Sequence, residues 1–473
     1  VFQMIKSFSL FAVAAVVIGV GTYYYLWRVP DMPKLDFERW WGNGDKPNED
    51  DKTIRAFKIV FNETMIEDLK YRLRNRRPYT QPLEGMQSEY GINTIYLDKI
   101  LQYWHDKYNF KKRVDLLNRY PHYKTKIQGL DIHFIRVKPE STNKKILPIL
   151  LMHGWPSSSK EFDKVIPMLT TPRTEYDFVF EVIAVDLPGF GFSEGTNKPG
   201  LTPVQIGIIM RNLMKRIGID KFYIQAGDWG SQAATHIHCL QFISYRLSMS
   251  CIYQTRVCFR FHSNMPLSSR SISNLKYVIG SMFPSLFVES KHKHRLYPLK
   301  DFFLYLVRES GYFHLQATKP DTIGAAVTDT PAGMAAYVFE KIGVCSNKKQ
   351  LHTQHGGLDN IDIDDLLDTA TILWANACIT TSMRIYAEAF AWPETYIVHD
   401  IPTKVPTAAV NFLHEVIYQP DWILRDKFIN LVHSTTLDFG GHFAAMQTPK
   451  ELVDDVFASV NEFIKFNTKN GKK

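Results

Sequence analysis

The sequence contains few cysteines and no recognisable set of metal ligands. Only five of its 473 residues are cysteine, too few for a disulfide scaffold and typical of a reducing environment. Neither a Cys-x-x-Cys pair nor a His-Glu-x-x-His motif occurs, so no metal site is expected. The Gly-x-Gly of residues 189–191 follows Pro188 and lacks a correctly placed third glycine, so no cofactor is expected either.

The sequence also lacks a strong charge of one sign. Its net charge of +8 is mild for this length, and no stripe of lysine and arginine interleaves with aromatic residues. Nucleic acid is therefore not expected as a partner. With 45% apolar residues the chain can bury a large core, and its length predicts a core domain with an inserted or appended part.

One long run without charge lies near the N-terminus. Residues 8–27 have about the length that a bilayer requires, and the run ends in aromatic residues followed by Arg28. We expect residues 1–29 to form a single membrane anchor, because interfacial aromatics rather than a polar mature start follow the apolar run. Basic residues on both sides, Lys6 and Arg28, leave the orientation of the anchor open.

Strand-like and helix-like stretches alternate through the middle of the chain. A hairpin is predicted at residues 123–137, and apolar strands follow at 146–152, 178–185 and 221–224, with two more at 405–412 and 431–437. Helices are predicted at 160–169 and 420–428. This alternation predicts an α/β fold with a largely parallel sheet, while aromatic-rich helical stretches after residue 262 predict a lid. The expected organisation is an anchor (1–29), an N-terminal helical extension (30–122), a core (123–262), a helical lid (263–400) and a second core part (401–473).

The strand at residues 221–224 leads through small residues into Asp228 and then into a helical stretch. This layout is typical of a nucleophile elbow, in which Ala226 and Gly230 allow strand and helix to approach while the nucleophile is held at the tip. A carboxylate at the tip can attack a saturated carbon and form an alkyl ester, which indicates epoxides or alkyl halides as substrates. The alternative is that Asp228 only caps the helix.

Two further segments fit the chemistry of an ester intermediate. The strand ending at Met152 leads into His153-Gly-Trp-Pro156, where an α/β-hydrolase places half of its oxyanion hole. His442 lies on a glycine-rich loop after the last predicted strand, where this fold places its base. The acid that orients His442 should follow the strand ending at Phe412; the candidates are Glu415, Asp421 and Asp400.

The chain resembles the microsomal epoxide hydrolases over nearly its whole length, anchor included. The motifs that carry the resemblance are residues 153–156, 227–231, 309–316, 318–322 and 440–445. By this resemblance Asp228 is the nucleophile, His442 the base, Glu415 the orienting acid, and Tyr312 and Tyr386 the donors to the epoxide oxygen. The backbone N–H groups of Trp155 and Trp229 would form the oxyanion hole.

The resemblance implies an α/β-hydrolase fold and a cofactor-free enzyme of the endoplasmic reticulum membrane that converts lipophilic epoxides to vicinal diols. His262-Ser-Asn-Met-Pro266 resembles the arthropod branch, in which insects degrade juvenile hormone. Residues 238–260 depart from the family, being longer and rich in cysteine. Two alternatives stay open: a haloalkane dehalogenase, since Trp229 suits halide binding, and a membrane-tethered lipid-binding protein on a hydrolase scaffold.

Overall fold

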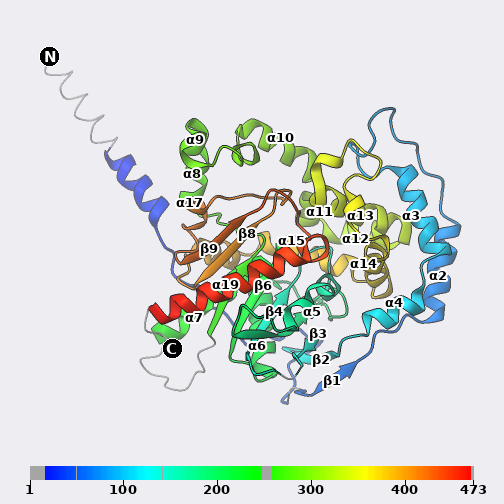
Figure 1. Cartoon of the computed structure of the whole chain (residues 1–473), viewed down its shortest axis with the longest axis horizontal. Coiled ribbons are helices and arrows are strands. Elements are labelled where there is room, and N and C mark those ends of the chain that lie inside the picture. Colours follow the sequence, from blue (N-terminus) through cyan, green and yellow to red (C-terminus); the bar gives the residue numbers. More distant parts are fainter. Residues whose placement is uncertain (1–15, 50, 141, 248–257, 470–473) are drawn as a thin grey trace.

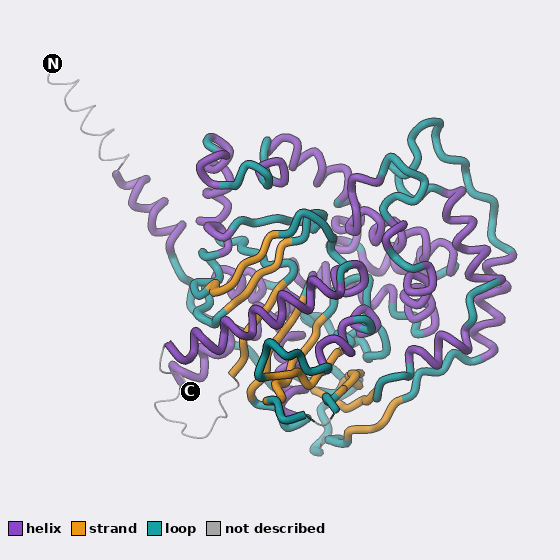
Figure 2. The backbone as a smooth tube through the Cα atoms, in the orientation of Figure 1, coloured by secondary structure: helices purple, strands orange, loops and turns teal. Residues whose placement is uncertain are grey.

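One mixed β-sheet runs through the centre of the molecule, with helices on both faces (Figures 1 and 2). The computed structural model describes residues 16–49, 51–140, 142–247 and 258–469. In these residues the strands are ordered β1-β2-β3-β5-β4-β6-β7-β8-β9. Their bounds are β1 Ile54–Phe57, β2 His122–Ile127, β3 Leu130–Val137, β4 Lys145–Met152, β5 Phe178–Val185, β6 Lys221–Ala226, β7 Cys258–Ser263, β8 Thr407–Asn411 and β9 Leu431–Thr436.

The sheet is parallel from β5 to β9 and antiparallel at its N-terminal edge, where β1, β2, β3 and β5 pair. The predicted hairpin and the predicted strands of the parallel part are present. Strand β5 is buried at all eight positions, as expected of a central strand covered on both faces. The carboxyl ends of β4, β6, β8 and β9 meet at one edge of the sheet, so the loops after them are brought together.

Helices cover the two faces of the sheet in separate layers. On one face, α6 (Pro203–Arg216) and α7 (Asp228–Leu247) contribute to the larger hydrophobic core. On the other, α5 (Val165–Thr170) and α19 (Pro449–Lys469) pack on β4, β5 and β8 in a second core. The expected helix over residues 160–169 is interrupted, with a 3-10 turn at Ser159–Phe162 before α5.

The segment before the hairpin forms α2 (Glu63–Arg74), α3 (Thr94–Asp106) and α4 (Phe110–Leu117), as its amphipathic pattern predicts. It also contains β1, which the sequence did not indicate because three of its four residues are exposed. Strand β1 extends the sheet by pairing with β2. The helices pack against the lid, where Trp104 Nε1 donates to Thr371 Oγ1 at 3.1 Å.

Between β7 and β8 the chain forms the helical layer expected of a lid. It stands over the carboxyl edge of the sheet (Figure 1). Its helices are α8 Ser271–Met282, α9 Pro284–Phe287, α10 Leu299–Glu309, α11 Gly311–Thr318, α12 Pro320–Thr328, α13 Pro331–Asn347, α14 Ile363–Ala375, α15 Ile379–Ala391 and α16 Pro393–Asp400, with 3-10 turns at Lys293–Arg295, Lys348–Gln350 and Leu358–Asn360.

After the lid, two short helices accompany β8 and β9, namely α17 (Asp421–Leu424) and α18 (Ala444–Gln447). Helix α17 is shorter than the helix that residues 420–428 suggest. The chain leaves the helix because Phe428 forms a β-bridge with Thr403, whose N–H donates to the Lys427 carbonyl at 2.7 Å.

Two segments with sequence-based expectations lie partly outside the described residues. Of the predicted anchor, residues 1–15 lie outside, and residues 16–27 form an exposed helix. Among the described residues, no helix combines the length and the apolar character needed to cross a membrane. Of the unusual segment 238–260, helix α7 continues to Leu247 and β7 begins at Cys258, while residues 248–257 lie outside.

Candidate active site

The turn between β6 and α7 holds Asp228 in a left-handed backbone conformation, with φ of +46°. This conformation is unfavourable for a residue other than glycine and is typical of the tip of a nucleophile elbow. The close approach of strand and helix is visible at Gly230, where an added Cβ would lie 2.4 Å from the Met152 carbonyl oxygen. The elbow therefore requires a small residue at this position, as the sequence predicts.

The loop after β4 brings the backbone of Trp155 to the Asp228 carboxylate. The Trp155 N–H donates to Asp228 Oδ1 at 2.8 Å. Gly154 makes this approach possible, since a Cβ there would lie 2.0 Å from the same oxygen. Trp229 opens the first turn of α7, whose amides have no partner within the helix, so its N–H is available at the same end.

His442 lies on the opposite side of the Asp228 carboxylate. Its Nε2 is 3.5 Å from Asp228 Oδ2, and its Nδ1 is 2.6 Å from Glu415 Oε1. The loops that carry His442 and Glu415 are joined by the backbone bond from the His414 N–H to the Gly440 carbonyl. The lid also holds His442, because the His442 N–H donates to the Cys345 carbonyl of α13.

The structure distinguishes among the three acids considered for the role of orienting His442. The Glu415 side chain is fully buried at the histidine. Asp421 is part-exposed and accepts a hydrogen bond from Ser434, and Asp400 lies 3.7 Å from Arg270. Only Glu415 of these three is paired with His442 in the described chain.

Charge controls the protonation of His442. Burial alone disfavours the imidazolium, but the neighbouring Glu415 and Asp228 carboxylates outweigh burial and raise the pKa of His442 well above its usual value. Before substrate reacts, the histidine is therefore protonated at neutral pH and pairs with Asp228. Loss of the Asp228 charge would remove one of the two carboxylates that raise the pKa of His442.

The phenols of Tyr312 and Tyr386 face the same space from two lid helices, α11 and α15. The Tyr312 ring stacks on Trp155 at a centroid distance of 5.5 Å, and the Tyr386 ring lies edge-on to Trp229 at 4.7 Å. The two tyrosine rings are 6.1 Å apart. Burial raises the pKa of both phenols well above the usual value, so both are protonated at neutral pH and can donate.

Other lid tyrosines are engaged elsewhere. The Tyr297 hydroxyl donates to the Tyr277 carbonyl, Lys348 lies over the Tyr305 ring at 4.7 Å, and the Tyr337 hydroxyl accepts from Gln316. Tyr337 still borders the site, edge-on to Trp155 at 6.0 Å. The structure therefore brings Tyr312 and Tyr386 together over Asp228, whereas the sequence alone could not choose among these residues.

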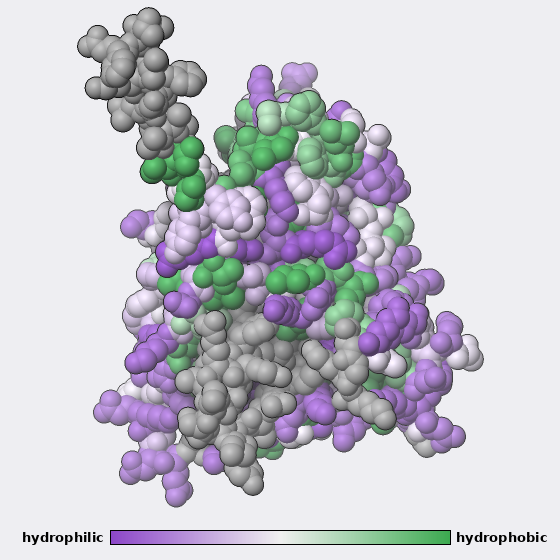
Figure 3. Space-filling view, turned by 90° about the vertical axis from the view of Figure 1, so that its left-hand side faces the viewer, coloured by the Kyte–Doolittle hydropathy of each residue, from purple (hydrophilic) through white to green (hydrophobic). Residues whose placement is uncertain are grey.

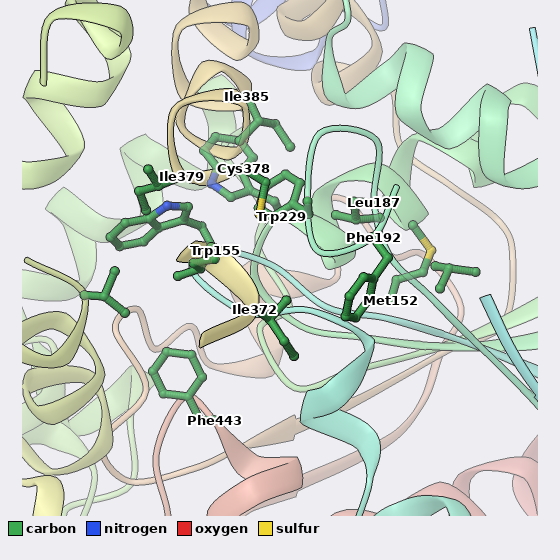
Figure 4. Close-up of a cluster of buried hydrophobic side chains, with 14 of the residues drawn as sticks. Met152, Trp155, Leu187, Phe192, Trp229, Ile372, Cys378, Ile379, Ile385 and Phe443 are labelled. Carbon is green, nitrogen blue, oxygen red and sulfur yellow. The ribbon is translucent and has the colours of Figure 1, made fainter. Parts of the chain in front are cut away.

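Apolar side chains enclose the space around the two tryptophans. Figure 4 shows Trp155 and Trp229 within one buried cluster that also includes Cys378, Ile379 and Ile385 of the lid. The surroundings of the two tryptophans are therefore apolar, which suits a lipophilic ligand. In the part of the chain that the structure describes, no three or more His, Cys, Asp or Glu side chains are arranged to hold a metal ion.

A buried set of hydrogen bonds beneath the Trp155 loop was not predicted from the sequence. Asp186 follows β5 and accepts from the Ser159 N–H at 2.6 Å and the Phe192 N–H at 2.8 Å, and its carboxylate also contacts His133 Nδ1. The Leu187 N–H donates to His153 Nε2. These bonds lock the loops after β4 and β5 together. The acid directly after an apolar strand was the available signal, since such a buried carboxylate must find donors.

A carboxylate at a strained elbow, faced by an amide donor and by a buried histidine–glutamate pair, defines an enzyme of the α/β-hydrolase class. Family models agree with this class: the epoxide hydrolase N terminus matches residues 54–162, and the alpha/beta hydrolase fold matches residues 148–239.

Similar proteins indicate which family within this class the chain resembles. The chain is 62% identical over 467 residues to the juvenile hormone epoxide hydrolase of Manduca sexta, covering 98% of each chain. It is 37% identical to epoxide hydrolase 1 of Sus scrofa, covering 93% of this chain and 96% of that one. The crystal structure of juvenile hormone epoxide hydrolase from the silkworm Bombyx mori matches with a TM-score of 0.86 at 40% identity, covering 92% of this chain and 100% of that one.

The chain belongs to the microsomal epoxide hydrolase family, with insect juvenile hormone epoxide hydrolases among its relatives. The expected family, fold class and enzyme class are thereby confirmed: the protein is an epoxide hydrolase with an α/β-hydrolase fold. The comparisons favour neither the dehalogenase nor the lipid-binding alternative.

Proposed function

We propose that this epoxide hydrolase opens lipophilic epoxides, juvenile hormone among them, through a covalent ester on Asp228 that His442 then hydrolyses. The observation that carries the proposal is the position of the Asp228 carboxylate, between the Trp155 N–H at 2.8 Å and the His442 Nε2 at 3.5 Å. One carboxylate oxygen is held by an amide, and the other faces the base and the buried space.

In the first step Asp228 Oδ2 attacks an epoxide carbon. Oδ1 stays on the Trp155 N–H and becomes the carbonyl oxygen of the ester, because it already occupies the donor site. The epoxide C–O bond breaks, and the alkoxide receives a proton through Tyr312 and Tyr386, whose buried phenols are protonated at neutral pH.

The second step uses the change in charge that the first produces. The ester carries no negative charge, so the pKa of His442 falls once Asp228 has reacted, and His442 releases its proton to solvent. Neutral His442, oriented by Glu415, then takes a proton from water that attacks the ester carbon. The amides of Trp155 and Trp229 stabilise the oxyanion. On collapse the ester C–O bond breaks, the leaving alkoxide takes the proton from His442 to give the vicinal diol, and the Asp228 carboxyl then returns a proton to His442.

The supports for juvenile hormone as a substrate are the relatives that carry this name and the apolar lining of the site. A test of the substrate compares kcat/KM for juvenile hormone, a fatty-acid epoxide and styrene oxide. We expect juvenile hormone to be preferred. A preference for styrene oxide would limit the proposal to the general epoxide hydrolase reaction.

We further propose that residues 1–29 anchor the enzyme in the endoplasmic reticulum membrane by a single span. The support is the uncharged run of residues 8–27 with its terminal aromatic residues. Such an anchor would place the active site close to the phase in which a lipophilic epoxide concentrates.

The mechanism is tested by separating its two steps. His442→Gln should still form the ester, so after mixing with substrate the protein should gain the mass of one substrate molecule, located on Asp228 by peptide mapping. Asp228→Ala should gain no mass. In ¹⁸O-water the wild type should carry label in its own Asp228 carboxylate after many turnovers. Label found only in the diol would mean that water opens the epoxide directly, and the covalent mechanism would be wrong.

A further inference from the structure

Helix α10 is an unusual helix for a surface in contact with water. None of its eleven residues is buried, although six consecutive residues, Phe302 to Val307, are apolar or aromatic. Phe303, Leu304 and Val307 are exposed. A helix with an outward apolar face needs an apolar surface to cover it.

The same surface continues over α8 and α9. The exposed apolar residues there are Val278, Ile279, Met282, Phe283 and Leu286. Figure 3 shows apolar side chains gathered at the top of this face of the molecule. We define these residues, together with Phe303, Leu304 and Val307, as the lid patch.

The lid patch is supported from below by ordered packing. Gly280 lies against the Tyr297 ring, whose hydroxyl would be 2.2 Å from an added Cβ. Lys276 pairs with Asp426 at 2.6 Å and donates to the Trp422 carbonyl. Helix α8 is therefore fixed to the second core part, and its apolar side chains project from an ordered support.

The surroundings of the lid patch point to a lipid bilayer as the partner. The helix of residues 16–27, which continues the uncharged N-terminal run, rises on the same side of the molecule in both views (Figures 1 and 3). It exposes Val16, Val17, Ile18 and Val20. An interface that follows the lid patch and this helix would therefore be apolar along its length, which is a requirement for interfacial insertion.

Charges near the lid patch fit the headgroup region. The basic side chains outnumber the acidic ones here. The exposed bases are Lys291, Lys300 and Arg308, and Lys293 is partly exposed. The exposed acids are Glu289 and Asp301. Basic side chains that flank an apolar surface favour anionic lipids. A protein partner would also cover an apolar patch, but the neighbouring uncharged run of bilayer length favours the membrane.

We propose that the lid patch inserts into the outer part of a bilayer and forms a second membrane attachment, independent of the N-terminal run. Helix α10 ends at Glu309 and α11 begins at Gly311, directly before Tyr312. An epoxide dissolved in the bilayer would thus enter beside the helix that carries a donor phenol. The role in substrate entry rests on the proposed function, whereas attachment to the bilayer does not.

The experiment uses the full chain with its N-terminal run disabled by Val16→Asp, Ile18→Asp and Val20→Asp, because carboxylates within the run oppose insertion. This background protein is mixed with vesicles of phosphatidylcholine and phosphatidylserine, and the floated fraction gives the partition constant. The patch variant adds Leu286→Gln, Phe303→Gln and Val307→Asn, at side chains exposed by 78%, 58% and 78%. The control variant adds Tyr90→Gln, Leu83→Gln and Val60→Asn, exposed by 77%, 61% and 70%.

We expect the background protein to float and the control to match it within about twofold. The patch variant should partition at least about tenfold more weakly, because three large apolar side chains leave the lipid. Circular dichroism and turnover of a small water-soluble epoxide check that each variant is folded. Absence of flotation by the background protein, or equal flotation of the patch and control variants, would overturn the proposal.

Two further readouts keep the possibilities apart. The first is the molar mass in lipid-free solution, which reports the oligomeric state. If the patch substitutions change the oligomeric state but not flotation, the lid patch is an interface between copies and the proposal is wrong. If flotation depends on the lid patch but KM for a vesicle-borne epoxide does not change, attachment stands and entry from the bilayer fails. Failure of the Asp228 ester experiment would leave the flotation result untouched.

Discussion

At the scale of single residues, the site works through the charge around one carboxylate. Asp228 is a nucleophile candidate because its backbone is held at φ of +46° and its two oxygens have different neighbours. His442 cannot act as a base while it holds a proton, and Asp228 is one of the two carboxylates that raise its pKa. In the proposed mechanism, reaction at Asp228 is thus the event that prepares His442 for the next step.

The phenols give a prediction at this scale. Tyr312→Phe and Tyr386→Phe should each slow epoxide opening, since in the proposed mechanism the two buried hydroxyls serve the same oxygen and can partly replace each other. The double variant should lose roughly 10²–10⁴-fold in the single-turnover alkylation rate, the usual contribution of a general acid. Tyr337→Phe is the matched control, because its ring borders Trp155 while its hydroxyl is bound to Gln316. Alkylation at the wild-type rate in the double variant would assign the proton to another donor.

At the scale of elements, four loops meet at the carboxyl edge of the parallel strands. The loops after β4 and β6 bring the Trp155 amide to Asp228, and those after β8 and β9 bring Glu415 to His442. The buried carboxylate of Asp186 fixes the first of these loops through the Ser159 N–H. The site geometry therefore depends on a layer of hydrogen bonds that does not touch the reacting atoms.

Gly154→Ala tests the fit between two of these loops. A Cβ at residue 154 would lie 2.0 Å from Asp228 Oδ1, so the loop must shift and carry the Trp155 N–H away from that oxygen. We expect kcat to fall about 10²–10³-fold, as when one oxyanion donor is lost. Gly311→Ala serves as a control, since no atom lies within 4 Å of its added Cβ although it adjoins Tyr312. A Gly154→Ala enzyme within twofold of wild type would show that this amide is not needed.

At the scale of the whole molecule, the sheet joins segments that are far apart in sequence. Strands β2 and β3 and the loop after β5 share a buried chain of contacts: His122 Nδ1 lies 2.9 Å from His133 Nε2, and His133 Nδ1 lies 2.7 Å from Asp186 Oδ2. Burial, with the nearby His133, lowers the pKa of His122 to about 4. The free energy of unfolding should therefore depend on pH through His122, which is not part of the proposed active site.

Whether stability rises or falls with pH depends on how many protons the folded and the unfolded chain bind. Between pH 6.5 and about 4 the unfolded chain binds a proton at His122 that the folded chain does not, so folding stability falls as pH falls through this range. From pH 6.5 to pH 5 the loss from this group is about 2 kcal/mol at most. His122→Gln should flatten the difference between urea unfolding free energies at pH 7 and pH 5, whereas exposed His352→Gln should leave it unchanged. An equal pH dependence in both variants would show that His122 is not responsible.

The sequence by itself determined the elements that rest on local patterns. Alternating and continuous apolar runs indicated β2 to β6, β8 and β9, and small residues around Asp228 indicated the elbow, because these features depend on neighbours a few positions away. Strand β1 escaped because a short, mostly exposed edge strand has little apolar pattern. The helix at 420–428 was overestimated because tertiary pairing at Phe428 ends it, and the helix at 160–169 is divided into a 3-10 turn and α5.

Only the tertiary structure decided which distant side chains meet. The sequence does not distinguish among the lid tyrosines, yet the Tyr312 ring stacks on Trp155 and the Tyr386 ring lies edge-on to Trp229, while Tyr305 and Tyr297 are engaged elsewhere. Glu415 reaches His442 because two loops are joined by a backbone bond after strands that lie side by side. Such contacts depend on the path of the whole chain, and a side-chain pattern cannot encode that path locally.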